Sequence, residues 1–195
     1  SFSSRLREVY GKNLGEQQKV YLNAIERSSL KMKKYIDDLA RFAMIAKVEI
    51  EFESIDLEEI FAKVLETLSA EIEKNEAKIT IESPHTLISV WQQLKEVFKN
   101  IISNSLYSKK ENTPLTIHVT SQKTADGLID IHIEDSGVGF DEKYIDKIFR
   151  PFQQLHRNQL EERSGMGLAI CKLIVERLVG KIITKSSPDK GATFT

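Results

Sequence analysis

The sequence predicts an α+β fold, in which an N-terminal helical hairpin is followed by an α/β sandwich. The first 46 residues contain no proline and repeat apolar residues at heptad spacing. From about residue 51, short segments alternate apolar and polar residues, as half-buried strands do. Amphipathic helical segments separate them, which favours a mostly antiparallel sheet with helices on one face. We predict two domains, a helical hairpin over residues 1–47 and a second domain over residues 48–195.

Composition limits the classes of function. Of 195 residues, 41% are apolar and 29% charged, as in ordinary soluble proteins, and the net charge of -1 gives no reason to expect a nucleic-acid partner. A single cysteine, Cys171, favours a reducing compartment such as the cytoplasm. No segment approaches the roughly 20 apolar residues of a membrane helix, and no signal peptide opens the chain. Because the chain starts in helix-like sequence and ends within a strand, "GATFT", we expect a piece of a longer protein, whose other parts could be membrane-anchored.

The first predicted element is a long helix that ends near Ala46. Apolar and small residues step alternately by four and three at Tyr21, Ile25, Ser28, Met32, Tyr35, Leu39 and Phe42. A second track runs beside them at Leu22, Ser29, Ile36 and Ala43, so the stripe is wider than a two-stranded coiled coil requires. The segment "YGKNLG" is expected to form a turn between this helix and a shorter one over residues 2–9. We predict a dimeric four-helix bundle; an intramolecular bundle or packing against the C-terminal half are the alternatives.

Short strands and helices are expected next. A strand after residue 51 leads to a helix with Asp56 near its N-cap, and a second strand spans residues 78–82. An amphipathic helix covers residues 90–108. Beyond Pro114, "LTIHVTS" and "LIDIHIED" alternate apolar and polar residues around Asp126-Gly127, which predicts a β-hairpin.

The last part of the chain predicts a short helix, "DEKYIDKIF", and then a buried one. Residues 167–179 are apolar nearly all round, which is typical of a helix enclosed by its neighbours. Gly180 follows as the expected C′ glycine that ends this helix.

Two asparagines form the first candidate for chemistry. Asn100 and Asn104 are four residues apart, so they share a face of their helix beside its buried stripe. A carboxamide oxygen is a neutral, hard ligand that suits a divalent cation already carrying phosphate oxygens. A solvated helix face explains the same pair.

The segment "EDSGVGF" is the second candidate. Asp135 is placed at the end of a strand, from which its carboxylate could accept a hydrogen bond from an exocyclic amine. Gly137 and Gly139 would let the backbone turn and a flat ligand lie close. A plain structural turn is the alternative.

The third candidate is "RSGMGLAICKLIVERLVG". Gly165 and Gly167 precede the buried helix, whose free backbone N–H groups and dipole would attract an anion. The spacing is not that of a P-loop, because no Gly-Lys-Ser/Thr follows. The preceding polar segment, "FRPFQQLHRNQLEER", is either a lid over a ligand or a disordered surface loop.

These motifs follow one another in a fixed order: the asparagine pair, Asp-x-Gly-x-Gly, Phe149 and Phe152, the second glycine motif and "KGATF". In that order they resemble the ATP-binding domain of the two-component sensor histidine kinases, within the Bergerat-fold ATPase superfamily, over about residues 51–195. "YLNAIERSSLKMKKYIDDLARFAMI" is also similar to the second helix of the dimerisation and phosphotransfer hairpin, especially in phytochrome-like kinases. On this reading the first helix of the hairpin is truncated.

The resemblance implies an ATP-dependent protein-histidine kinase with ATP and Mg²⁺ as cofactors, a homodimer formed through the hairpin, and a response-regulator receiver domain as partner. By resemblance, Asn104 would hold Mg²⁺, Asn100 would line the phosphate side and Asp135 would read the adenine amine beside Gly137 and Gly139. The other nucleotide-binding positions that it implies are Ser108, Lys109, Ile145, Phe152, Arg163, Ser164, Gly165, Met166, Gly167, Leu168 and Thr193.

The sequence departs from the family pattern at the phosphoacceptor. The resemblance implies an acceptor histidine on the first hairpin helix, but none of His85, His118, His132 and His156 fits. We expect the acceptor about a dozen residues upstream of Ser1, the alternative being a protein that never had one.

Three further positions differ from the residues that the resemblance implies for phosphate binding. Tyr107 replaces a lysine, Gln154 replaces an arginine and Arg163 replaces the first glycine of the second glycine motif. Losing charged donors should weaken the charge neutralisation on which phosphoryl transfer relies, although Arg157 or Arg163 could substitute.

Two other functions remain open beside the kinase. ATP-hydrolysing clamps, such as type II topoisomerases and the large heat-shock chaperones, resemble this chain in the pocket but carry a glutamate at the position of Asn100. An amide cannot accept a proton from water, which argues against a clamp. The other is a catalytically weak or inactive dimeric signalling scaffold that binds nucleotide, and the three departures favour it.

Overall fold

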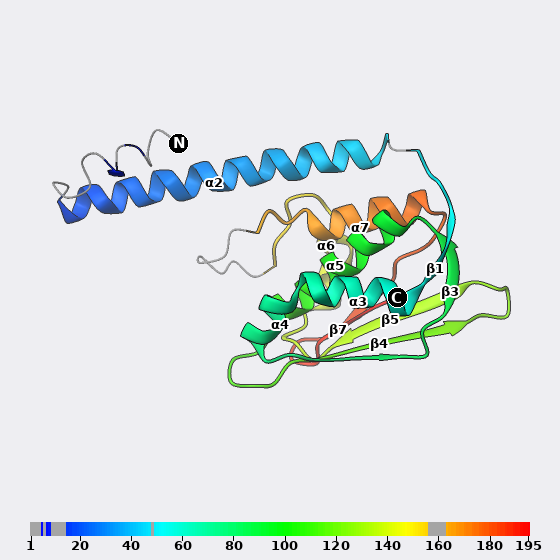
Figure 1. Cartoon of the computed structure of the whole chain (residues 1–195). Coiled ribbons are helices and arrows are strands. Elements are labelled where there is room, and N and C mark those ends of the chain that lie inside the picture. Colours follow the sequence, from blue (N-terminus) through cyan, green and yellow to red (C-terminus); the bar gives the residue numbers. More distant parts are fainter. Residues whose placement is uncertain (1–4, 6, 9–14, 48, 156–162) are drawn as a thin grey trace.

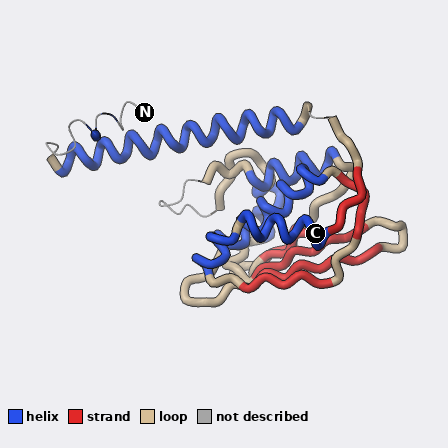
Figure 2. The backbone as a smooth tube through the Cα atoms, in the orientation of Figure 1, coloured by secondary structure: helices blue, strands red, loops and turns tan. Residues whose placement is uncertain are grey.

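A five-stranded sheet with helices on one face makes up most of the chain (Figures 1 and 2). The computed structural model describes residues 5, 7, 8, 15–47, 49–155 and 163–195. Its helices are α2 (Glu16–Ile45), α3 (Leu57–Thr67), α4 (Ser69–Asn75), α5 (Trp91–Tyr107), the 3₁₀ turn η2 (Glu142–Tyr144), α6 (Ile145–Ile148) and α7 (Gly167–Arg177). Its strands are β1 (Glu53–Asp56), β2 (Lys78–Glu82), β3 (Thr86–Ser89), β4 (Thr116–Lys123), β5 (Ile129–Asp135), β6 (Thr184–Ser186) and β7 (Ala192–Phe194). The predicted α+β class is confirmed.

The sheet has the strand order β2-β4-β5-β7-β6. Only β2 and β4 pair in parallel among these neighbours; the other pairs are antiparallel. The predicted hairpin is β4 and β5, in which Val119 lies opposite Ile133, and Gly127 takes a φ of 81° in the turn. Strands β1 and β3 form a separate two-stranded sheet. This register places Asp135, the last residue of β5, opposite Ile117 on β4 and Ala192 on β7.

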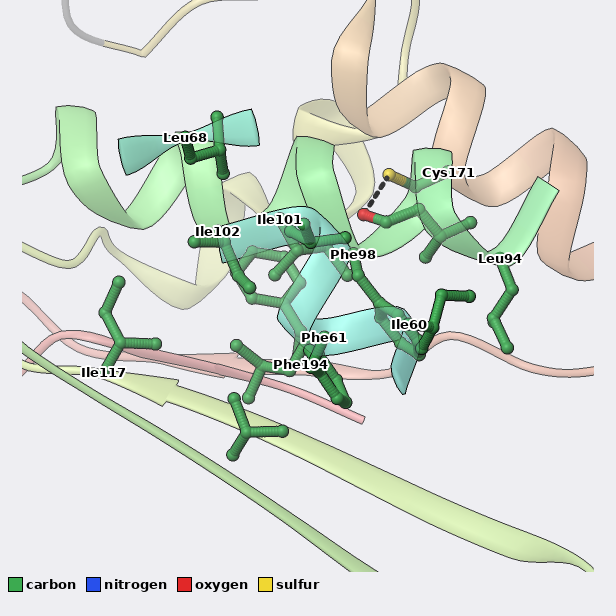
Figure 3. Packing of buried hydrophobic residues seen from close by; sticks show 14 of the residues in the cluster. Ile60, Phe61, Leu68, Leu94, Phe98, Ile101, Ile102, Ile117, Cys171 and Phe194 are labelled. Atoms are coloured by element: carbon green, nitrogen blue, oxygen red, sulfur yellow. Dashed lines mark hydrogen bonds between the residues drawn. The ribbon is translucent and has the colours of Figure 1, made fainter. Parts of the chain in front are cut away.

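The core lies between the helical layer and the sheet. The rings of Phe61 on α3 and Phe98 on α5 stack with centroids 4.4 Å apart, above Ile117 and Phe194 of the sheet (Figure 3). Each such side chain contributes about 1.5–3 kcal/mol when fully buried. Cys171 of α7 is part of the same core: burial raises the pKa of its thiol, which donates to the Val97 carbonyl at 3.6 Å.

Of two helix ends predicted from local sequence, one is confirmed and one is wrong. Asp56 caps α3 as predicted, because its carboxylate accepts from the Glu58 N–H at 2.8 Å. The prediction that Gly180 is the C′ residue of α7 is wrong, since Val179 takes the left-handed conformation there, with a φ of 60°. The Gly180 N–H bonds to the Val175 carbonyl and the Val179 N–H to that of Glu176, which is the Schellman pattern one residue earlier.

Helix α2 lies beside the helical layer (Figure 1). Its heptad stripe is largely uncovered. No residue of α2 is fully buried, and Ile36 in the stripe is 67% exposed. Near its end, Phe42 and Ile45 pack against the core. Arg7 forms a salt bridge with Glu26 at 2.5 Å, so residue 7 lies against the first half of α2. The predicted turn over residues 10–15, apart from Gly15, lies outside the described residues, as does most of the helix predicted over residues 2–9.

Among the described residues, no helix combines the length and apolar character needed to cross a bilayer.

Candidate functional site

A cavity of about 890 Å³ opens between α5, α7, the ends of β5 and β7, and helix α2. Its volume falls within the range of about 300–1,000 Å³ typical of small-molecule sites. Many of the predicted site residues line it, from three separate stretches of sequence: Asn100, Asn104, Ser108, Asp135, Gly139, Arg163, Ser164, Gly165, Gly167 and Leu168. The fold therefore brings the asparagine pair and both glycine motifs together around one space.

Asp135 is the most deeply buried acid on the cavity wall, at 4% exposed. Its Oδ1 accepts the Gly137 N–H at 2.9 Å and the Ala192 N–H at 3.3 Å, and its Oδ2 accepts the Ser105 hydroxyl at 2.9 Å. Burial raises the pKa of this carboxyl, and the three hydrogen bonds oppose that rise. A carboxylate offers about four acceptor positions, so the three described donors leave Oδ2 with capacity for one more.

The glycines near Asp135 are required mainly by the packing of the chain on itself. A Cβ on Gly139 would lie 2.1 Å from the Ser187 carbonyl oxygen, and one on Gly191 would lie 1.8 Å from that of Asp135. A Cβ on Gly137 would lie 2.3 Å from the Ser108 hydroxyl. Gly139 lines the cavity, but the space beside Gly137 is taken by Ser108, so its lack of a side chain brings α5 and β5 together and does not by itself open room for a ligand.

Asn100 lies where α5 meets the start of α7. A Cβ on Gly167 would lie 3.3 Å from its Oδ1, so the glycine lets the N-terminus of α7 approach this amide closely. The Asn100 Nδ2 donates to Glu96 at 3.2 Å, and Glu96 in turn forms a 3.0 Å salt bridge with Arg41 of α2. The amide is thereby held by a contact that begins on α2.

Asn104 is bound to Arg163. The Arg163 Nη1 donates to Asn104 Oδ1 at 2.7 Å, and its Nη2 donates to the carbonyl and the hydroxyl of Ser103 at 2.7 and 2.9 Å. The guanidinium also lies over the Tyr107 ring, 4.4 Å from its centroid. The side chain of Gln154 donates to the Arg163 carbonyl. The three residues that depart from the family pattern, Tyr107, Gln154 and Arg163, are thus one contiguous cluster.

The remaining predicted positions lie off the cavity wall. Thr193 is on the far face of β7, because alternation along the strand turns its neighbours Ala192 and Phe194 to the cavity instead. Met166 is buried in the core, and Phe152, 45% exposed, sets its ring against that of Tyr35. Lys109 donates to the Asn75 carbonyl at 2.6 Å and lines a second cavity of about 430 Å³.

Ile145 opens helix α6, and Ile148, one turn further on, reaches the cavity in its place.

The described side chains offer few ligands for a metal ion. Within the described ranges, no group of three or more histidine, cysteine, aspartate or glutamate side chains could hold an ion. Asn104 offers one neutral oxygen, which fits a Mg²⁺ that keeps its phosphate and water ligands, and this oxygen already accepts one hydrogen bond from Arg163.

The described histidines lie away from this wall. His118 and His132 are on β4 and β5, and the ring of His85 bonds to Ser83 and Ser121. His156, Arg157 and most of the predicted lid lie outside the described residues.

Several wall residues were not predicted. Ser105 of α5 is one of them, and its hydroxyl bonds to Asp135. Lys34, Asp38 and Arg41 reach the cavity from α2. The sequence carries no local signal for these contacts, because they depend on how distant elements pack.

Comparison with known proteins shows the family to which the C-terminal half belongs. The model of a family described as "Histidine kinase-, DNA gyrase B-, and HSP90-like ATPase" matches residues 89–195. The "Phytochrome-like protein Cph1" of Synechocystis sp. (strain ATCC 27184 / PCC 6803 / Kazusa) is 30% identical over 95% of this chain and 24% of its own length.

Two solved structures share the fold. One is the full-length ShkA in complex with AMPPNP (TM-score 0.73, 20% identity, 97% of this chain and 40% of that one). The other is histidine kinase ThkA in complex with the response regulator protein TrrA (TM-score 0.69, 22% identity, 99% of this chain and 55% of that one). The chain spans about a quarter of the length of the phytochrome relative.

Proposed function

The chain belongs to the family of histidine kinase-, DNA gyrase B- and HSP90-like ATPases, and from this premise we propose that it is the catalytic core of a protein-histidine kinase. ATP binds in the cavity, and its γ-phosphoryl group passes to a histidine upstream of Ser1 and then to a response-regulator aspartate. Residues 1–47 form the dimerisation hairpin, residues 48–195 form the ATP-binding domain, and the assembly works in the cytoplasm.

The environment of Asp135 carries the proposal. A buried carboxylate that is held by two backbone N–H groups and a hydroxyl, with one acceptor position remaining, suits the exocyclic amine of adenine. On the same wall, Ser164 and Gly165 precede the N-terminus of α7, where backbone N–H groups and the helix dipole favour phosphate. Asn104 would hold Mg²⁺, which neutralises phosphate charge when bound, and Asn100 would lie on the phosphate side.

The side chain at position 100 distinguishes between a kinase and an ATP-hydrolysing clamp as the function of this chain. Its amide cannot serve as a base for water, and it already donates to Glu96. Transfer to a histidine needs chiefly in-line positioning, which this wall can supply.

Replacing Asp135 with Asn tests the adenine assignment. Losing a charge-assisted hydrogen bond should weaken ATP binding by about 1–3 kcal/mol, measured by calorimetry. Glu134→Gln is the matched control, because Glu134 is the exposed neighbour on the same strand. Equal affinities for ATP in the wild-type chain and Asp135→Asn would refute the role.

A second candidate, the nucleotide-binding scaffold, is favoured by one observation: Arg163 occupies the oxygen that Mg²⁺ would need. The parent protein with the residues preceding Ser1 should be incubated with γ-labelled ATP and Mg²⁺. An acid-labile phosphoprotein supports the kinase, whereas tight ATP binding without one supports the scaffold.

A further inference from the structure

One oxygen of Glu96 joins helix α2 to the cavity wall. Glu96 Oε1 accepts the Arg41 Nη1 at 3.0 Å and the Asn100 Nδ2 at 3.2 Å. Arg41 belongs to α2, whereas Glu96 and Asn100 lie one helical turn apart on α5. Arg41 and Asn100 both line the larger cavity. These three side chains therefore form a chain of contacts that starts on α2 and ends at the site.

The chain of contacts becomes more enclosed from α2 inwards. The side chain of Arg41 is 51% exposed and that of Glu96 is 23% exposed. Burial is the main cause that raises the pKa of the Cys171 thiol in α7, and the charge of Glu96 raises it further, so this charge acts on α7 as well as on α2. A carboxylate in such a partly enclosed place is costly without a cation, and Arg41 supplies that cation.

The two ends of the Asn100 amide face different surroundings. Its Nδ2 donates to Glu96, while its Oδ1 lies towards the start of α7, where a Cβ on Gly167 would be 3.3 Å away. An ionised carboxylate only accepts hydrogen bonds, so Glu96 can bond the nitrogen end of the amide but not the oxygen end. The flipped amide would place its oxygen against the carboxylate. Glu96 therefore selects one orientation of Asn100.

We propose that Arg41 is a positioning residue for nucleotide binding: it holds Glu96, and Glu96 fixes the orientation of the Asn100 amide at the cavity wall. The amide oxygen then remains available to the water or cation that accompanies the phosphates. This inference rests on the proposed function, and it adds to the site a residue of α2, which lies outside the domain over residues 48–195.

The first test observes Asn100 without any nucleotide. In the ¹⁵N-labelled 195-residue chain, the NMR signals of this side-chain amide are identified by their loss in Asn100→Asp. Arg41→Ala should shift and broaden them, because Glu96 is then free to move. Arg41→Lys should restore most of the change, since one N–H group makes the contact. Lys34→Ala is the matched control: Lys34 is another cation of α2 on the same cavity, outside this chain of contacts, and its loss should leave the signals in place. Unchanged signals in Arg41→Ala would overturn the inference.

The second test measures ATP affinity by calorimetry in a double-mutant cycle. Arg41→Ala should weaken ATP binding by about two- to fivefold, as expected for a partly exposed ion pair, and should have no effect once Asn100 is alanine. If Arg41 contacted the nucleotide directly, the two losses would add, and the inference would be overturned.

Thermal unfolding checks that each variant keeps the fold, and Arg41→Gln replaces Arg41→Ala if the latter unfolds early. The two tests also separate this inference from the proposed function. Failure of the unchanged chain to bind ATP would overturn the proposed function and the role in nucleotide binding, whereas the NMR signals would still decide whether Arg41 positions Asn100.

Discussion

The side chain of Asp135 lies buried at the cavity wall, where burial favours the neutral form of its carboxyl group. Burial is the largest influence on its pKa and raises it above the usual value of 3.8, while hydrogen bonds from Gly137, Ser105 and Ala192 lower it. The folded chain therefore binds this proton more readily than the unfolded chain does. The ionised carboxylate reduces stability at neutral pH, which is a common feature of residues kept for ligand binding.

The sign of this effect gives a pH-dependent prediction. Because the folded pKa is raised, the contribution of Asp135 to stability is present below pH 3.8 and is lost as pH rises through the folded pKa. The free energy of unfolding of the wild-type chain, minus that of Asp135→Asn, should therefore fall from pH 4 towards neutrality and then level off. Urea titrations at several pH values measure this difference. A difference that increased with pH would show that the hydrogen bonds dominate over burial.

Asn104 gives a prediction about the metal. Asn104→Ala removes the only oxygen that we assign to Mg²⁺, so ATP affinity should lose its dependence on Mg²⁺ while adenosine affinity stays unchanged. Calorimetry with ATP at increasing Mg²⁺ concentration measures the effect. If the Mg²⁺ dependence survived, the ion would have to be held elsewhere.

Helix α7 contains a strained end. Val179 is β-branched, 91% exposed and has a φ of 60°, a conformation that costs an L-residue about 1–2 kcal/mol. Val179→Gly should raise the free energy of unfolding by about 1 kcal/mol, measured by urea denaturation. Gly127→Ala provides the opposite control. An added Cβ at Gly127 would meet no atom, but the φ of 81° strains an alanine, so this variant should destabilise the chain. A lower free energy of unfolding in Val179→Gly than in the wild-type chain would contradict the claim that Val179 is strained.

The elements with long, regular patterns were predictable. Helix α5 was expected over residues 90–108 and spans Trp91–Tyr107, and the alternating segments became β4 and β5. Strands β3 and β6, of four and three residues, were not predicted. Gly180 was chosen as the end of α7 on residue type, whereas the hydrogen bonds place the left-handed residue one position earlier.

The site was predictable only in part. Asp135, Asn100 and Asn104, which line the cavity, could be predicted as site residues because strand ends and helix faces can be located from local sequence patterns. Met166 and Phe152 are neighbours of cavity residues in sequence but point elsewhere, and side-chain direction near a turn cannot be obtained from spacing. The contact between Arg163 and Asn104 joins residues 59 positions apart, which no local pattern encodes.

Across the whole molecule, the uncovered stripe of α2 calls for a partner. The exposed apolar side chains of this stripe include Met32, Ile36 and Leu39. Such a series of large apolar side chains on one helix is typical of an interaction surface. We propose that a second copy covers it, so the chain should sediment as a dimer. Ile36→Glu, which places a charge in the stripe, should shift it to monomer, whereas Lys33→Glu on the same helix should not. A monomeric wild-type chain in analytical ultracentrifugation would exclude this dimer.

Helix α2 also supplies Lys34, Asp38 and Arg41 to the cavity wall, and Arg41 reaches Asn100 through Glu96. An occupant that reaches this part of the wall contacts α2 as well as the helices and strands beyond it. Thermodynamic reciprocity then applies: an occupant held more tightly while the long helix is docked must strengthen that docking by the same factor. A displacement of α2 and the binding of a ligand in the cavity can in this way influence each other directly.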